Sequence, residues 1–178
     1  YVDFNNPDAL NLSGYATLTA WVNWTGAGSS DGDFILGKET NYLWAIGDNG
    51  SIAATGHVAF ALRTGGSWEW RDTGYTISTG ALTYLVLTYD RTNAYLYANG
   101  SLVSTIADYR GGSVNTSTGE FWIGKRPSGA VHEFNGIIDE PTVSGALRTA
   151  NWISTQYNNQ NSPSTFYTTN SLQSQAYS

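Results

Sequence analysis

The sequence predicts an all-β domain in which two antiparallel sheets pack face to face, with one short helix near the C-terminus. Three observations support this fold class. Short runs rich in β-branched and aromatic residues recur along the chain, and glycine and asparagine separate them at regular spacing. The length of 178 residues also suits a single all-β domain, since such domains routinely reach about 200 residues.

The predicted strands follow in chain order. They lie at residues 16–24, 34–39, 42–47, 57–63, 82–90, 94–105, 120–126 and 135–144. Within 94–105, the dipeptide Asn99-Gly100 separates two apolar runs, and it suits a type I′ turn because that turn needs positive φ at both central residues. We therefore expect a hairpin there and at least eight strands in all, enough for two sheets.

One helix is predicted at residues 146–159, where Leu147, Trp152 and Ile153 provide an imperfect apolar stripe. Pro163 and a segment rich in Ser, Thr and Gln follow it. We therefore predict a domain at residues 1–160 and a C-terminal extension or linker at residues 161–178. Such a segment is typical of a chain that continues into another module.

Composition narrows the classes of partner. The net charge is −6, with only 8 Lys and Arg residues, so the chain lacks the basic surface needed for nucleic acid or for an anionic membrane. No apolar run approaches the roughly 18 residues of a membrane span. The absence of cysteine excludes disulfides, thiolate catalysis and cysteine zinc sites.

Several motifs together resemble a known family. They are "YVDFNNPDALNL", "ATLTAWVNW", "FILGKE", the hairpin "YLVLTYDRTNAYLYANGSLVST", "FWIG" and "FNGIIDEPTVS", in this order over about residues 1–155. The chain thus resembles the laminin-G-like, concanavalin A-like jelly roll of bacterial extracellular proteins. This resemblance implies a monomeric carbohydrate-binding or adhesion domain of a larger secreted or surface protein, with a structural calcium ion.

The resemblance also implies where calcium would bind. In the family a structural calcium often lies where the first strand meets the "NGxxDE" strand, which makes Asp139 the first expected ligand, with Asp3 and Asn5 as further ligands. Oxygen ligands of these types suit Ca²⁺. The alternative is that Asp139 accepts backbone N–H groups at a strand end. Asp31 and Asp33 flank a glycine, but a plain turn explains them better than a calcium loop.

An enzyme is not expected. A glycosidase needs two carboxyl groups that flank one bond, and the neighbouring residues Asp139 and Glu140 should point to opposite faces of a strand. A lyase would need a His, Tyr and Arg constellation, and His57, His132 and Arg63 form no recognisable one. The sequence therefore predicts a non-catalytic protein.

Tryptophan indicates carbohydrate binding, because an indole face stacks on the C–H face of a sugar. Trp68 and Trp70 are two residues apart, so both rings should share one face of a strand, with Arg71 and Asp72 as polar partners. Trp44 is a further candidate, although a core position explains it as well. Burial of the Trp68 and Trp70 pair is the competing interpretation.

A second candidate region is "GKRPSGAVHEF". There Lys125, Arg126 and His132 concentrate positive charge, which would suit sulfated or uronic polysaccharides, and a solvated loop is the alternative. Trp21, Trp122 and Trp152 are expected to be structural. The sequence thus predicts a carbohydrate-binding module, and the alternative is a protein-binding adhesion or spacer domain.

Overall fold

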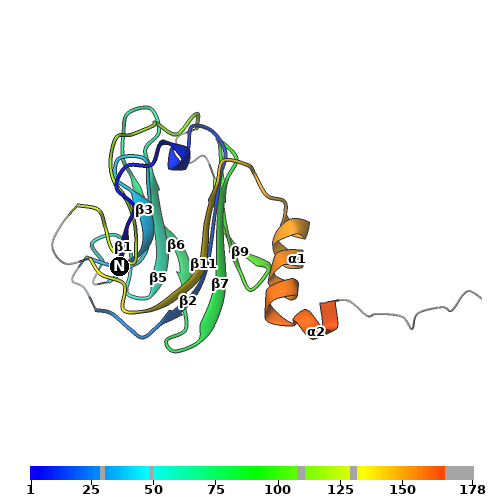
Figure 1. Cartoon of the computed structure of the whole chain (residues 1–178). Helices are drawn as coiled ribbons and strands as arrows, with labels where there is room; N and C mark the ends of the chain where they lie inside the picture. Colours follow the sequence, from blue (N-terminus) through cyan, green and yellow to red (C-terminus); the bar gives the residue numbers. More distant parts are fainter. Residues whose placement is uncertain (29–30, 49, 108–110, 129–131, 167–178) are drawn as a thin grey trace, which may run out of the picture.

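The computed structural model describes residues 1–28, 31–48, 50–107, 111–128 and 132–166, and it confirms the predicted sandwich of two antiparallel sheets (Figure 1). The six-stranded sheet has the order β1-β10-β3-β4-β5-β6, and the five-stranded sheet has the order β11-β2-β7-β8-β9. The strand β6 is therefore an edge strand, in agreement with the glycine-flanked segment that contains Trp70.

The six-stranded sheet comprises β1 (Val2–Asp3), β10 (Phe121–Ile123), β3 (Asp33–Lys38), β4 (Tyr42–Ile46), β5 (His57–Leu62) and β6 (Trp70–Thr76). The five-stranded sheet comprises β11 (Gly136–Ser144), β2 (Ala16–Trp24), β7 (Leu82–Tyr89), β8 (Ala94–Ala98) and β9 (Ser101–Ile106). A short 3-10 helix, η1 (Asp8–Leu10), lies between β1 and β2.

The core lies between the sheets and follows from strand alternation. In β4, Tyr42, Trp44 and Ile46 point inward and join the main hydrophobic cluster, which also contains Leu18 of β2 and Leu85 of β7. The predicted hairpin joins β8 and β9, and its central residues Asn99 and Gly100 have φ values of 49° and 80°. Both are positive, as the type I′ prediction requires.

The predicted helix is α1 (Ala150–Asn161), which lies against the outer face of the five-stranded sheet (Figure 1). It begins later than predicted because Thr149 caps it, accepting a hydrogen bond from the Trp152 backbone N–H at 3.3 Å. Ile153 is fully buried against Trp21 of β2 and its neighbours. Trp152 packs on the same cluster, in the structural role that the sequence predicts.

Pro163 ends one helix and begins another. The helix α2 (Pro163–Phe166) starts at this residue, where a missing N–H costs nothing. In the described part of the chain, no helix is both long enough and apolar enough to cross a membrane.

Candidate functional site

The outer face of the six-stranded sheet carries a cluster of aromatic and basic side chains. Because Trp44 points into the core, Leu43 and Ala45 on either side of it point outward. Phe34 of β3 lies opposite Ala45 and therefore shares this outer face. We define the aromatic patch as the residues that gather here: Phe34, Trp68, Trp70, Arg126 and His132.

The two tryptophans of the predicted pair both contact the floor of the patch. The Trp70 ring meets Phe34 edge-on, with ring centroids 5.7 Å apart and an interplanar angle of 83°. Trp68 precedes β6 but packs on the same Phe34 cluster, so the two rings share one face as their spacing predicts. Both are half-buried, so each ring still presents part of its surface to solvent.

Arg126 and His132 reach the patch from the segment between β10 and β11. The His132 ring lies 5.5 Å from the Phe34 ring, and the Arg126 guanidinium carbon lies 5.9 Å from it. Burial lowers the pKa of His132, and the charges of Arg126 and Lys125 add to this effect while Asp31 opposes it. His132 is therefore neutral at neutral pH. Its buried Nδ1 has no hydrogen-bond partner among the described residues.

The cations of this segment are paired with carboxylates. Arg126 donates from Nε and Nη2 to the two oxygens of Glu39, both at 3.2 Å. Lys125 Nζ donates to Glu133 Oε1 at 3.1 Å. Because His132 is neutral as well, the segment does not carry the net positive charge that its sequence suggests. This argues against the predicted match to sulfated or uronic polysaccharides.

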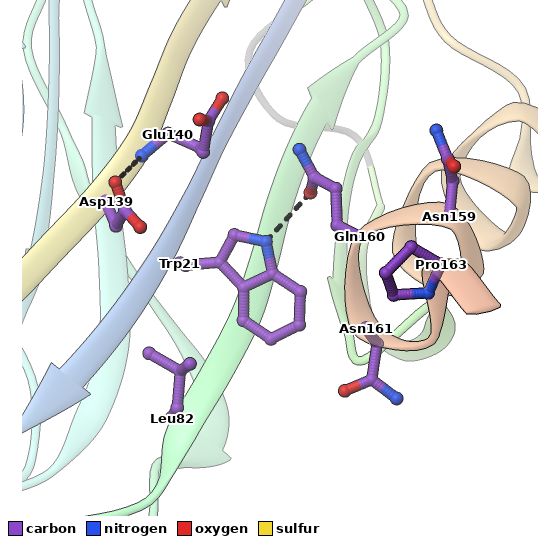
Figure 2. A pocket seen from close by; sticks show the side chains of 8 residues that line it. All are labelled: Trp21, Leu82, Asp139, Glu140, Asn159, Gln160, Asn161 and Pro163. Carbon is purple, nitrogen blue, oxygen red and sulfur yellow. Dashed lines mark hydrogen bonds between the residues drawn. The ribbon is translucent and has the colours of Figure 1, made fainter.

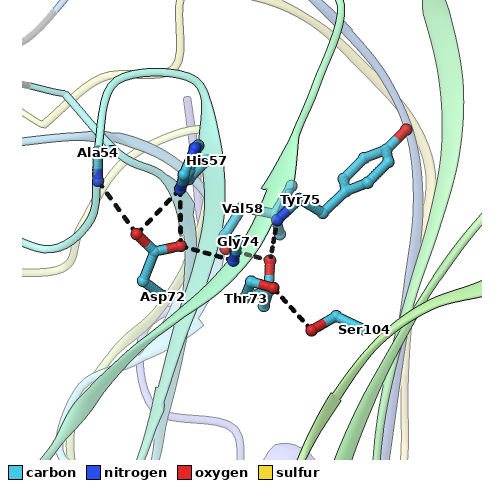
Figure 3. Close-up of polar contacts among 8 residues, drawn as sticks. All are labelled: Ala54, His57, Val58, Asp72, Thr73, Gly74, Tyr75 and Ser104. Carbon is cyan, nitrogen blue, oxygen red and sulfur yellow. Dashed lines mark hydrogen bonds and ion pairs between the residues drawn. The ribbon is translucent and has the colours of Figure 1, made fainter.

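Asp72 shares the outer face with Trp70, but its carboxylate is already occupied (Figure 3). Its oxygens lie 2.9 and 3.0 Å from His57 Nδ1 and accept hydrogen bonds from the Gly74 and Ala54 backbone N–H groups. Burial alone would raise the pKa of Asp72, yet these hydrogen bonds together hold it below its ordinary value. Asp72 therefore connects β6 by hydrogen bonds to β5 and to the loop that precedes β5.

Arg71 points to the other side of its strand. It lies opposite the core residue Phe60 in the ladder, and its guanidinium pairs with Glu69 at 2.6 Å. The structure therefore does not bring Arg71 together with the two tryptophans.

Two other tryptophans lie on opposite sides of the six-stranded sheet, and the structure corrects the assignment of the first. Trp44, a predicted carbohydrate contact, is fully buried in the core. It points between the sheets because it lies on the same face of β4 as Tyr42 and Ile46. Trp122, expected to be structural, is half-buried and points to the outer face, because it lies opposite Gly37 of β3. Its ring stacks on Tyr1, with centroids 4.9 Å apart and planes 10° apart.

The predicted calcium ligands do not converge. Asp139 lies opposite Trp21 in β11 and faces outward from the five-stranded sheet. Asp3 lies opposite Trp122 in the other sheet, where it accepts the Asn5 backbone N–H at 2.7 Å. Within the described residues, no three acidic or histidine side chains gather as a metal site. These three residues therefore do not fit one calcium ion, and calcium binding itself stays a prediction.

A hollow lies between α1 and the five-stranded sheet, and we call it the helix groove (Figure 2). One part has a volume of about 530 Å³. Its lining comes from β2, β7, β11, the end of α1 and the start of α2: Trp21, Leu82, Asp139, Glu140, Asn159, Gln160, Asn161 and Pro163. The Trp21 indole lies between the two carboxylates and Gln160, to which its Nε1 donates a hydrogen bond at 2.8 Å.

A β-bulge puts both carboxylates into this groove. Asp139 pairs with Trp21 and Thr142 pairs with Thr19, so two residues of β11 stand opposite one of β2. Glu140 adopts a φ of 48°, and the alternation of side chains is interrupted there. The prediction that Asp139 and Glu140 face opposite sides is therefore wrong, because it assumed a regular strand.

The groove continues along α1 past Glu140 and Gln160. This second part has a volume of about 340 Å³ and is lined mainly by polar side chains: Thr17, Thr19, Tyr84, Glu140, Thr142, Val143, Ser144, Arg148, Trp152, Gln156 and Gln160. Thr19 and Thr142 hydroxyl oxygens lie 2.6 Å apart on its floor. The two parts share Glu140 and Gln160, so they adjoin each other along α1.

Sequence reasoning missed the residues that organise both sites. Phe34 was expected only as part of a strand, and a bulge between Phe34 and Leu36 determines that Phe34 faces outward. Gln160 belongs to a helix whose packing partner is 139 residues earlier in the chain. No local pattern predicts either position. The sequence does indicate one feature of the patch. Because Tyr42, Trp44 and Ile46 alternate as apolar core residues, Leu43 must point to the outer face of β4.

Comparison with known proteins agrees with this fold. A family model described as the concanavalin A-like lectin/glucanases superfamily matches residues 1–154. No curated protein matches the sequence.

Solved structures are similar at low sequence identity. A proposed carbohydrate-binding protein from Bacteroides ovatus has a TM-score of 0.63 and 22% identity over 86% of this chain. The present chain spans 41% of that protein. Domain 4 of AbnA, an extracellular arabinanase of Geobacillus stearothermophilus solved with arabinotriose, has a TM-score of 0.61 and 21% identity, covering 83% of this chain and 68% of that one.

The similarity extends to a further binding domain. The binding domain of Paraclostridial Mosquitocidal Protein 1 has a TM-score of 0.65 but only 10% identity, covering 90% of this chain and 41% of that one. At these identities the likeness shows a shared fold.

Proposed function

The chain belongs to the concanavalin A-like lectin/glucanases superfamily, and we propose that it is a non-catalytic carbohydrate-binding domain that holds a glycan on the aromatic patch. We further propose that it forms part of a larger secreted or cell-surface bacterial protein. The observation that carries this proposal is the meeting of Trp68, Trp70 and His132 around Phe34 on one outer face.

The chemistry of the patch suits a sugar. The half-buried rings of Trp68 and Trp70 offer apolar surface for the C–H face of a sugar, and their packing against the Phe34 cluster limits the entropy lost on binding. Arg126 lies beside this surface and can offer guanidinium N–H donors to sugar hydroxyls, whereas the buried His132 packs against Phe34 and supports the patch. Small-ligand sites usually combine apolar rings with a few fixed polar groups, and the patch has this composition.

The charge of the patch favours an uncharged glycan. Both cations of the segment between β10 and β11 are paired with glutamate, and the imidazole of His132 is neutral at neutral pH. An acidic glycan would therefore gain little electrostatic attraction and would have to compete with Glu39 for Arg126.

The geometry also supports binding without catalysis. Asp139 and Glu140 both belong to one wall of the helix groove, whereas glycosidase carboxylates must flank the bond that they cleave. Asp139 Oδ1 accepts the Glu140 backbone N–H at 2.9 Å. Two of the similar structures are described as carbohydrate-binding or were solved with a bound sugar, which is consistent with the proposal.

The test is a binding measurement with three defined oligosaccharides. We expect calorimetry to detect binding of arabinotriose or cellotriose, both neutral, and weaker or no binding of trigalacturonic acid. Trp70→Ala should weaken binding at the aromatic patch at least tenfold, equivalent to about 1.4 kcal/mol. Trp122→Ala is the matched control, because Trp122 is also a half-buried outer-face tryptophan but stacks on Tyr1 outside the patch.

Three results would decide against the proposal. Equal loss of affinity in Trp70→Ala and Trp122→Ala would mean that the patch has no special role. Absence of binding to a broad array of glycans would favour the alternative of a protein-binding adhesion or spacer domain. Release of reducing sugar from any of the probes would contradict the non-catalytic assignment.

A further inference from the structure

We infer that the helix groove is a second saccharide-binding site, separate from the aromatic patch and selective for uncharged oligosaccharides. The inference concerns the opposite outer face of the sandwich, and it does not depend on whether the patch binds sugar.

The first support is the shape of the groove. Two hollows of about 530 and 340 Å³ run along α1 and share Glu140 and Gln160. Either volume is in the range of small-ligand sites. The walls are a regular helix and a strand of the five-stranded sheet, and α1 is fixed by its buried residue Ile153. The groove is therefore held open by packed elements rather than by a loop.

The second support is the chemistry of its lining. Most lining residues carry hydroxyl, amide or carboxylate groups, which pair with sugar hydroxyls. The rings of Trp21 and Trp152 contribute apolar edges at the floor and on the helix wall. A docked peptide helix would instead need a continuous apolar groove. The mixture of dispersed polar groups with aromatic carbon is what recognition of a sugar requires.

The third support concerns charge and explains the expected selectivity. The lining includes the carboxylates of Asp139 and Glu140 and the guanidinium of Arg148. Within the described residues, neither carboxylate forms an ion pair. An acidic glycan would meet two carboxylates against a single guanidinium, whereas the hydroxyls of a neutral glycan can donate hydrogen bonds to these carboxylates.

The experiment follows the indole N–H resonances of the protein by NMR while a neutral trisaccharide is added. Trp21 and Trp152 report the groove, and Trp68 and Trp70 report the patch. We expect cellotriose or arabinotriose to shift the Trp21 resonance, because Trp21 Nε1 is bonded to the groove residue Gln160. Trigalacturonic acid should not change the chemical shift of the Trp21 indole N–H.

Two kinds of variant test where the ligand lies. Thr142→Tyr fills the exposed floor of the groove, and it should abolish the Trp21 shift. Thr105→Tyr places the same side chain on an exposed position of β9 in the same sheet and should leave the shift unchanged. Glu140→Gln removes a charge with little change in shape, and it should admit trigalacturonic acid more readily than the original protein does.

The outcomes separate the two sites. Retention of the Trp21 shift in Trp70→Ala, with its loss in Thr142→Tyr, supports the groove. A Trp21 resonance that stays fixed with both neutral probes overturns the inference, whatever happens at Trp68 and Trp70. A Trp21 shift that persists in Thr142→Tyr also overturns it. Shifts at Trp21 without any at Trp68 or Trp70 would uphold the groove and contradict the function proposed for the patch.

Discussion

Trp44 and Trp70 lie in the same sheet but differ in what surrounds them. Trp44 is fully buried between the sheets, and its Nε1 has no hydrogen-bond partner among the described residues. Trp44→Ala should therefore lower the free energy of unfolding by about 3–5 kcal/mol, through lost burial and a cavity. Urea denaturation measures this loss.

Two further variants make this prediction specific. Trp44→Phe should cost much less, because it keeps a ring and removes an unpaired buried N–H. Trp70→Ala should also cost less than Trp44→Ala, since its ring is only half-buried on the outer face. Equal losses for the two alanine variants would contradict the assignment of Trp44 to the core.

Asp72 should make stability depend on pH. Its folded-state pKa lies below the ordinary value of 3.8, because hydrogen bonds from Gly74, His57 and Ala54 outweigh the effect of burial. A depressed carboxyl pKa stabilises the fold above the unfolded value, and this contribution is lost as the pH falls through the folded pKa. Denaturation of the wild type between about pH 5 and pH 2 should show this decline.

The corresponding variant is Asp72→Asn. It should be less stable than the wild type at pH 5, and the gap should narrow as the pH falls. Asp3→Asn is the control, since it alters another exposed strand aspartate that accepts a single hydrogen bond from Asn5. A gap of constant size across the acidic range would show that Asp72 does not titrate in this way.

At the scale of elements, the β8–β9 hairpin is coupled to α1. Gly100 has a φ of 80°, and a Cβ added there would lie 3.1 Å from Tyr157 Cδ1 and 3.3 Å from Ser154 Cα. Gly100→Ala should thus strain the turn and press against the helix, costing more than about 1 kcal/mol. Gly80→Ala is the matched control, because its φ is 75° but nothing lies within 4 Å of the added atom.

The comparison isolates helix packing from backbone strain. Both variants carry the left-handed strain, so thermal denaturation should show a larger loss for Gly100→Ala. Broadening or shift of the Tyr157 ring resonances should accompany it. Equal losses of thermal stability in the two variants would mean that α1 shifts easily to make room for the added methyl group, so that α1 is not a rigid wall of the helix groove.

The elements also show what local sequence could predict. The strand at residues 16–24 agrees with β2 (Ala16–Trp24), and Asn99-Gly100 forms the expected turn, because alternation and turn chemistry act over a few residues. The bulge at Glu140 was not predictable from alternation, because it depends on pairing with Thr19 and Trp21 in another strand. That one irregularity reversed the expected geometry of the acidic pair.

At the scale of the whole molecule, each candidate site joins residues far apart in the chain. The spacing of Trp68 and Trp70 indicated half of the aromatic patch, and the charged segment indicated Arg126 and His132. Their meeting at Phe34 depends on the order β10-β3-β4-β5-β6 in the sheet. The helix groove depends on how α1 docks. Sequence patterns therefore suggested site residues, whereas sheet topology determined which of them meet.

The two sites lie on opposite outer faces, so one short oligosaccharide cannot contact both. Two trisaccharide molecules should bind per domain. One domain should be able to hold two chains of a long neutral polysaccharide, one on each face, and so link them. Beads coated with such a polysaccharide should therefore aggregate when the domain is added. Trp70→Ala and Thr142→Tyr should each strongly reduce aggregation, because bridging needs both sites, while each variant still adheres to the beads. Loss of adhesion in either single variant would show that only one site binds sugar.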